Sequence, residues 1–289
     1  TGTQFFARTM SEMIDSCTAY HEPGTPWITK PGKLPDQIRE FGLYHMTLGQ
    51  LDPENCMFKL STDRIAGRVS ESKVKENIIN MREDLISGID SDIYLESSGH
   101  LYGTLDKVDD VIPNSNFVFI IRDPRNWVKS AMNTFEYILY GPLDPEFLNI
   151  SIKASDLSRS EYQEDWDEMA IFEKYCWYYN LVNTFVINRM KGRENFRIYR
   201  HEDLFNDRDT FMDMLNFVSR FRDGFKTSFS YESSLMNKVH SNANKDKFPG
   251  WEEWNEEMIN KFNEHCGKWM DHFNYGQEEK WLNKIRKVS

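Results

Sequence analysis

The feature that most constrains this fold is a run of five apolar residues, Phe117–Ile121, which ends at Arg122. Both faces of such a strand are apolar, which is typical of a central parallel strand covered by helices. Pro113-Asn114-Ser115 breaks the chain before the run, and we expect a helix to begin near Asn126. The run therefore predicts an α/β architecture.

Two further segments repeat this pattern of strand and helix. Asp92–Glu96 predicts a short strand, followed by a turn at Ser97–Gly99 and a helix over His100–Val111. Phe196–Tyr199 predicts another strand, after a long and nearly apolar helix over Glu164–Met190. The alternation favours an α/β fold with a central parallel sheet flanked by helices, in which ligands lie beyond the carboxyl ends of the strands.

Length and charge exclude several classes of protein. The chain has 289 residues, of which 39% are hydrophobic, so it can bury a large core, and no linker or repeat divides it. We expect a single domain over residues 1–289. No apolar run approaches the length of a membrane span, so no membrane partner is expected. The net charge of −11 argues against nucleic acid as a partner.

The cysteines favour a reducing compartment. Cys17, Cys56, Cys176 and Cys266 are widely spaced, and none forms a CxxC pair, so no metal site is expected. Reduced and mostly buried thiols are the simplest interpretation. They favour a cytoplasmic location, with the Golgi lumen as the alternative.

A Gly2-Thr3 turn opens the chain and leads into an amphipathic helix. Backbone N–H groups at the start of a helix can cradle an anion, and glycine lets the chain approach it closely. No lysine follows Gly2, so the pattern differs from the GxxxxGK[ST] loop of nucleoside triphosphatases. We expect a strand to precede this turn in the intact protein. The apolar face of the helix comprises Phe5, Phe6, Met10, Met13 and Ile14.

A second candidate anion site follows the Phe117–Ile121 strand. Arg122 offers a planar fork that suits a phosphate, and Ser130 lies eight residues further on, in the next helix. A hydroxyl and a helix N-terminus would add donors for the same anion. The alternative is that Arg122 pairs with Asp123 or with another carboxylate of the fold.

Together these elements resemble the sulfotransferases that use 3′-phosphoadenosine-5′-phosphosulfate (PAPS). Gly2-Thr3 is similar to the family's SGTT-like loop, and the Arg-Asp-Pro-Arg of residues 122–125 with Ser130 matches its second motif. His201–Leu204 resembles its Tyr-Glu-Asp-Leu motif, with histidine in place of tyrosine. Two later segments follow in the same order, a basic loop that leads to a tryptophan (Lys245–Trp251) and the C-terminal Phe273–Gly276.

The resemblance implies a P-loop-like sulfotransferase fold and a function. A sulfuryl group would pass from PAPS to a hydroxyl or amine of a small molecule and release 3′,5′-adenosine bisphosphate, with no metal required. The family's pattern also places a basic residue directly before Thr1. The donor-binding residues implied are Thr1, Gly2, Thr3, Gln4 and Phe5 for the 5′-phosphosulfate, Arg122 and Ser130 for the 3′-phosphate, Lys245, Lys247 and Gly250 closing over it, and Tyr199 at a strand end.

Three residues are candidates for the base that takes the acceptor's proton. His100 follows a strand-end turn and resembles the histidine of cytosolic small-molecule sulfotransferases. Glu22 lies after the first helix and Glu96 at a strand end, where other relatives carry a glutamate. The structural alternatives are that His100 caps its helix, that Glu22 pairs with a loop lysine, and that Glu96 binds amides of its own turn.

The acceptor and the runner-up functions stay open at this stage. Negative charge disfavours polyanionic acceptors, so a neutral or cationic small molecule is expected, and the oligomeric state is undetermined. Tyrosines 137, 140, 175, 178 and 179 with Trp177 line an acceptor pocket or, more simply, form core. A small-molecule or nucleoside kinase with a degenerate P-loop is one alternative function, and an inactive nucleotide-binding relative is another.

Overall fold

The computed structural model describes residues 2–26, 31–133, 150–157, 160–236 and 247–288. They form two compact units, each built from two stretches of the chain. The first unit comprises residues 1–120 and 186–241, and the second comprises residues 121–185 and 242–289. The fold is mixed α/β, rich in helix, with two small sheets. The expectation of one domain over residues 1–289 stays a prediction.

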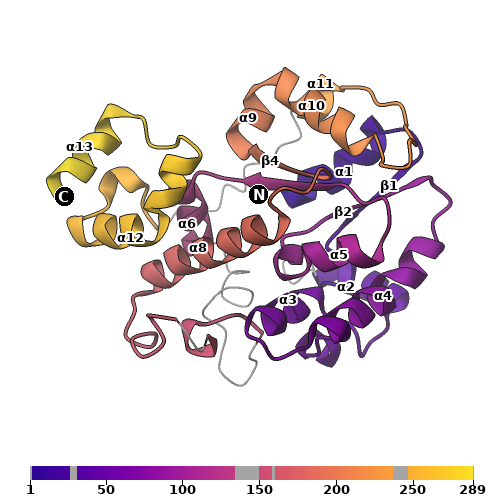
Figure 1. Ribbon diagram of the computed structural model, residues 1–289, viewed down its shortest axis with the longest axis horizontal. Helices are drawn as coiled ribbons and strands as arrows, with labels where there is room; N and C mark the ends of the chain where they lie inside the picture. The colour runs from indigo at the N-terminus through magenta and orange to yellow at the C-terminus, as the bar shows by residue number, and fades with distance from the viewer. Residues whose placement is uncertain (1, 27–30, 134–149, 158–159, 237–246, 289) are drawn as a thin grey trace. The chain divides into compact units, whose positions relative to one another are not determined.

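The first sheet of the first unit pairs β1 (Cys17–His21) with β2 (Ile93–Ser97). The strands are parallel, with Cys17 opposite Ile93 and His21 opposite Ser97. Helix α1 (Thr3–Met13) packs against both strands (Figure 1). The strand β2 was predicted one residue too early in the chain, at Asp92–Glu96, whereas β1 was not predicted. The sequence Cys-Thr-Ala-Tyr-His offers no apolar run, and only Cys17 of the strand is fully buried.

The apolar face of α1 is buried as predicted. Phe5, Phe6, Met10, Met13 and Ile14 are at most 8% exposed. The rings of Phe5 and Phe205 meet edge to face, with their centroids 5.0 Å apart. The core beneath α1 is completed by residues of later helices, Leu204, Phe211 and Leu215.

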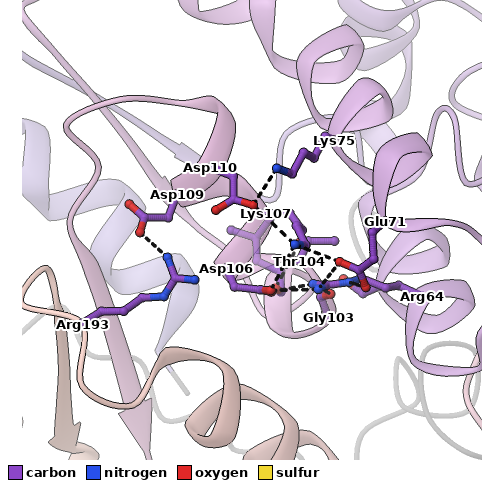
Figure 2. Close-up of polar contacts among 12 residues, drawn as sticks. Arg64, Glu71, Lys75, Gly103, Thr104, Asp106, Lys107, Asp109, Asp110 and Arg193 are labelled. Atoms are coloured by element: carbon purple, nitrogen blue, oxygen red, sulfur yellow. Dashed lines mark hydrogen bonds and ion pairs between the residues drawn. The ribbon is translucent and has the colours of Figure 1, made fainter.

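Three helices surround the loop that follows β2. They are α3 (Met57–Ile65), α4 (Glu71–Ser87) and α5 (Leu105–Val111). Figure 2 shows Arg64 of α3 held by Asp106 of α5, at 2.5 and 2.8 Å, and by Glu71 of α4, at 2.9 Å. Both the Arg64 and Asp106 side chains are buried. The Arg64 network therefore joins the three helices.

The predicted helix over His100–Val111 is interrupted. A short 3₁₀ turn, η3 (Leu101–Gly103), comes first, and α5 begins only at Leu105. Helix α3 approaches this turn closely, because a Cβ on Gly103 would lie 2.4 Å from the carbonyl oxygen of Ser61.

The second sheet pairs β3 (Phe117–Ile121) with β4 (Phe196–Arg200). Both strands were predicted, and so was the alternation of strand and helix. Since the described strands form two separate pairs, the single central sheet and the P-loop-like fold stay predictions. Helices that follow β4 in the first unit are α9 (His201–Asn206), α10 (Arg208–Val218) and α11 (Ser233–Met236).

The second unit is helical in its described part. It contains α6 (Pro124–Asn133), the first three quarters of α8 (Ile171–Met190), α12 (Glu256–His272) and α13 (Glu279–Val288). Helix α6 begins at Pro124, two residues before the position expected. Helix α8 begins at Ile171, so the predicted start at Glu164 was wrong: the preceding residues form turns.

The aromatic residues of α8 form core, as the simpler interpretation held. At most 6% of each side chain is exposed for Tyr175, Trp177, Tyr178 and Tyr179. The other two candidates, Tyr137 and Tyr140, lie outside the described residues. All four cysteines are buried and free, as predicted. No helix within the described ranges is long and apolar enough to cross a bilayer. The remaining elements are α2 (Leu34–Phe41), η1 (Pro31–Lys33), η2 (Leu48–Leu51), η4 (Ala154–Asp156) and η5 (Trp251–Glu253).

Candidate functional site

The candidate site lies at the carboxyl ends of β1 and β2, in the first unit. His21 is the last residue of β1 and is opposite Ser97, the last residue of β2. Glu22 follows the first strand directly, and His100 lies three residues beyond the second. The Glu22 N–H donates to the carbonyl oxygen of Ser97, at 3.2 Å, so the two chains stay together beyond the sheet. Parallel pairing thus gathers polar residues that lie far apart in the sequence.

The first turn of α1 begins at a left-handed glycine. Gly2 adopts a left-handed conformation with φ of +77° and precedes the helix without a side-chain cap. No acidic residue lies in that turn, although the positive end of a helix dipole favours one. The Thr3 Oγ1 lies 3.1 Å from His21 Nε2, so the helix start adjoins the end of β1.

Glu22 is a strained, mostly buried carboxylate. Its φ of +47° is unusual for a residue other than glycine, and its side chain is 17% exposed. Oε1 accepts a hydrogen bond from the Gly99 N–H at 3.0 Å, and Oε2 lies 3.8 Å from His21 Nε2. Burial raises the pKa of Glu22, but the nearby charges of His100 and His21 and the Gly99 N–H together lower it below its ordinary value. Glu22 is therefore ionised at neutral pH.

His100 is positioned from both sides. Its main-chain N–H donates to Ser98 Oγ at 3.0 Å, and its Nδ1 lies 3.3 Å from Thr25 Oγ1. The Phe58 ring of α3 packs against the imidazole, with centroids 5.0 Å apart. The side chain of His100 makes no hydrogen bond that caps η3, so the structural alternative of a helix cap is wrong.

Glu96 has a structural partner. Arg82 of α4 donates to both carboxylate oxygens, at 2.7 and 2.9 Å, and Tyr94 donates to Oε2 at 2.8 Å. The Arg82 and Glu96 side chains are both less than 10% exposed. Glu96 therefore forms a buried ion pair with Arg82, rather than binding the amides of its own turn. A carboxylate held on both oxygens by a guanidinium is poorly suited to accept a proton.

The loop after β1 is fixed by residues that the sequence analysis missed. Gln50 Nε2 donates to the carbonyl oxygen of Gly24 at 2.9 Å, and His45 Nε2 lies 3.0 Å from the same oxygen. Burial lowers the pKa of His45, which favours the neutral imidazole. His21 and Thr25 were also missed, because β1 was not predicted and its carboxyl end was not sought.

Gln4, Phe5 and Tyr199 of the first unit play different parts. Gln4 is exposed on α1, whereas the Phe5 ring is in the core, so that only its backbone is available to a ligand. The Tyr199 hydroxyl donates to Asp213 Oδ2 at 2.6 Å. Burial and this carboxylate raise the pKa of Tyr199, so the hydroxyl stays protonated. Thr1 lies outside the described residues.

The second unit holds the predicted phosphate-binding residues. Arg122 follows β3 and is half-buried, and its carbonyl oxygen accepts from the Tyr179 hydroxyl at 2.7 Å. Asp123 accepts from Arg125, through Nη2 at 2.6 Å and Nε at 3.1 Å. In this Arg-Asp-Pro-Arg segment the carboxylate therefore orders the second arginine. Ser130 lies within α6 and is half-buried.

The C-terminal loop is anchored to α6 by a residue that was not predicted. Asn133, at the end of α6, accepts from the N–H groups of Lys247 and Phe248, both at 2.8 Å. Gly250 follows in a close turn, in which a Cβ would lie 2.5 Å from the Glu252 carboxylate. The loop that carries Lys247 and Gly250 is thus joined to the helix that carries Ser130. Lys245 lies outside the described residues.

Within the first unit, the site combines an uncapped helix start with one carboxylate and two imidazoles. Such a group can bind an anion and take a proton from a neighbouring hydroxyl. No protein-family model, curated protein or solved structure matches this chain.

The buried Arg82–Glu96 pair predicts that Glu96, unlike the other candidate bases, contributes mainly to the stability of the fold. Glu96→Gln leaves the Arg82 guanidinium buried without its counterion, so the free energy of unfolding should fall by about 3–5 kcal/mol. The measurement is chemical denaturation. The control is Glu83→Gln, an exposed position on α4 next to Arg82, which should change the free energy of unfolding by less than about 0.5 kcal/mol. Equal stability of Glu96→Gln and wild type would contradict the structural role.

Proposed function

We propose that this protein is a sulfotransferase, which moves the sulfuryl group of PAPS to a hydroxyl or amine of a small molecule and releases 3′,5′-adenosine bisphosphate. The observation that carries the proposal is the contact between Thr3, at the uncapped start of α1, and His21, which lies beside Glu22. Anion-binding groups and acid–base groups therefore adjoin each other.

The first turn of α1 suits the 5′-phosphosulfate. Main-chain N–H groups of Thr3, Gln4 and Phe5 begin the helix, and Gly2 adopts the left-handed conformation that favours glycine. The absence of an acidic residue from this turn leaves its partial positive charge for a ligand. The 3′-phosphate is the part of the donor that the sequence resemblance assigns to Arg122 and Ser130.

The chain's own residues account for the proton transfer. His100 takes the acceptor's proton as the acceptor oxygen attacks sulfur, and the ionised Glu22 stabilises the imidazolium that forms. In this proposal Thr3 and His21, whose side chains lie 3.1 Å apart, would donate hydrogen bonds to the sulfuryl oxygens. PAPS, when bound, supplies the sulfuryl group, and the bond from sulfur to the bridging phosphate oxygen breaks as the new one forms. The net charge of −11 favours a neutral or cationic acceptor.

Calorimetric titration with 3′,5′-adenosine bisphosphate tests the donor assignment. We expect wild-type protein to bind it without metal and more tightly than it binds ATP with Mg²⁺. Arg122→Ala should weaken this binding by about 2–4 kcal/mol, because a charged hydrogen-bonded partner of a phosphate is lost. Arg39→Ala is the control, since the Arg39 side chain is 80% exposed. Unchanged affinity in Arg122→Ala, or no binding by folded wild type, would contradict the proposal.

The pH dependence of turnover distinguishes the two remaining bases. If His100 is the base, kcat/KM should fall as the pH is lowered, because only a neutral imidazole can take the proton. If Glu22 takes the proton directly, the fall should begin only below pH 4.5, because the pKa of this carboxyl is lowered from that value.

We expect the first profile. His100→Ala should abolish its acid limb and lower kcat by about 10²–10⁴-fold, while bisphosphate binding is retained. His272→Ala, at an exposed position, is the control. An acid limb that is unchanged in His100→Ala would show that His100 is not the base.

A further inference from the structure

A second group of polar side chains lies in the second unit, where α12 packs beside α8. Glu173 of α8 and Glu264 and His265 of α12 each offer one ligand atom, and these atoms lie within 4.8 Å of one another. His265 Nε2 is 3.5 Å from Glu173 Oε1. Both side chains of this closest pair are buried, that of His265 to 1% exposure and that of Glu173 to 8%. Two carboxylates and one imidazole therefore converge at one point.

His265 is the unusual member of this group. Its Nε2 is buried, yet it forms no hydrogen bond with any of the described residues, although a carboxylate oxygen is 3.5 Å away. A buried polar atom without a hydrogen bond needs a partner, and an ion is one such partner.

A cation already lies between the two carboxylates. Lys261 Nζ is 2.8 Å from Glu173 Oε1 and 3.6 Å from Glu264 Oε2. The Lys261 side chain is 41% exposed, so it can swing into solvent on its flexible stem without losing much packing. The ammonium group therefore stands where a metal ion would bind and would compete with it.

Tyr162 orients the other two members. Its hydroxyl donates to Glu264 Oε1 at 2.7 Å, and its ring packs on the imidazole of His265, with centroids 4.8 Å apart. Metal ligands are commonly held by such outer contacts, which fix their rotamers before the ion arrives.

We propose that Glu173, Glu264 and His265 form a binding site for a divalent transition-metal ion such as Zn²⁺, which displaces Lys261 and links α8 to α12. An imidazole with two carboxylates suits Zn²⁺ better than Ca²⁺ or Mg²⁺, which prefer oxygen ligands alone. The sequence analysis expected no metal because it considered cysteine spacing, and this site uses no cysteine. The site is independent of the proposed sulfuryl transfer.

The site is tested by a calorimetric titration of the metal-stripped protein with Zn²⁺. We expect one equivalent to bind to wild type, and Co²⁺ to bind with the visible absorption of a protein-ligated ion. Lys261→Met removes the competing ammonium group, so its affinity for Zn²⁺ should rise at least tenfold. Glu173→Gln and His265→Ala should each weaken binding at least tenfold, and Glu257→Gln, exposed on α12, is the matched control.

The Lys261→Met variant keeps the test decisive if a ligand variant fails to fold. Loss of Lys261 removes no metal ligand, so only a site that shares its carboxylates would bind Zn²⁺ more tightly. Thermal unfolding gives a second readout, since Zn²⁺ should raise the Tm of wild type and of Lys261→Met. The proposal is overturned if Lys261→Met binds no more tightly than wild type, or if binding survives in Glu173→Gln and His265→Ala.

Discussion

The candidate site depends on the parallel pairing of β1 with β2. This pairing sets His21 opposite Ser97, so that the residues after each strand, Glu22 and His100, emerge at the same edge of the sheet. Because α1 packs against both strands, its first turn lies beside that edge, and Thr3 comes within 3.1 Å of His21. The start of a helix and a group of titratable side chains thus meet, although they come from separate parts of the sequence.

Buried ion pairs hold the surroundings of this edge. Arg82 joins α4 to the end of β2 through Glu96, and Arg64 joins α3 to α4 and α5 (Figure 2). Breaking such a pair is costly, because one buried charge would be left without a counterion. These pairs fix the helices around the site, and Glu22, with its positive φ, adds backbone strain within it.

The sequence predicted the elements whose apolar pattern is strong. Phe117–Ile121 and the buried face of α1 were found because apolar residues recur at the spacing of a strand or a helix. Strand β1 was missed because it is stabilised by pairing with β2. The sequence Cys-Thr-Ala-Tyr-His has no apolar pattern that would predict a strand. His21 was missed for the same reason, since it ends β1. The structural role of Glu96 was also missed, because its partner Arg82 is fourteen residues away on another element.

Hydrogen–deuterium exchange of the wild-type chain, with and without 3′,5′-adenosine bisphosphate, tests most directly whether the start of α1 is the anion-binding half of the site. Bound phosphate would accept hydrogen bonds from the N–H groups of the first helical turn. We therefore expect slower exchange at Thr3, Gln4 and Phe5, and at the Glu22 and Gly99 amides beside them. Binding that leaves exchange at the start of α1 unchanged would contradict this account.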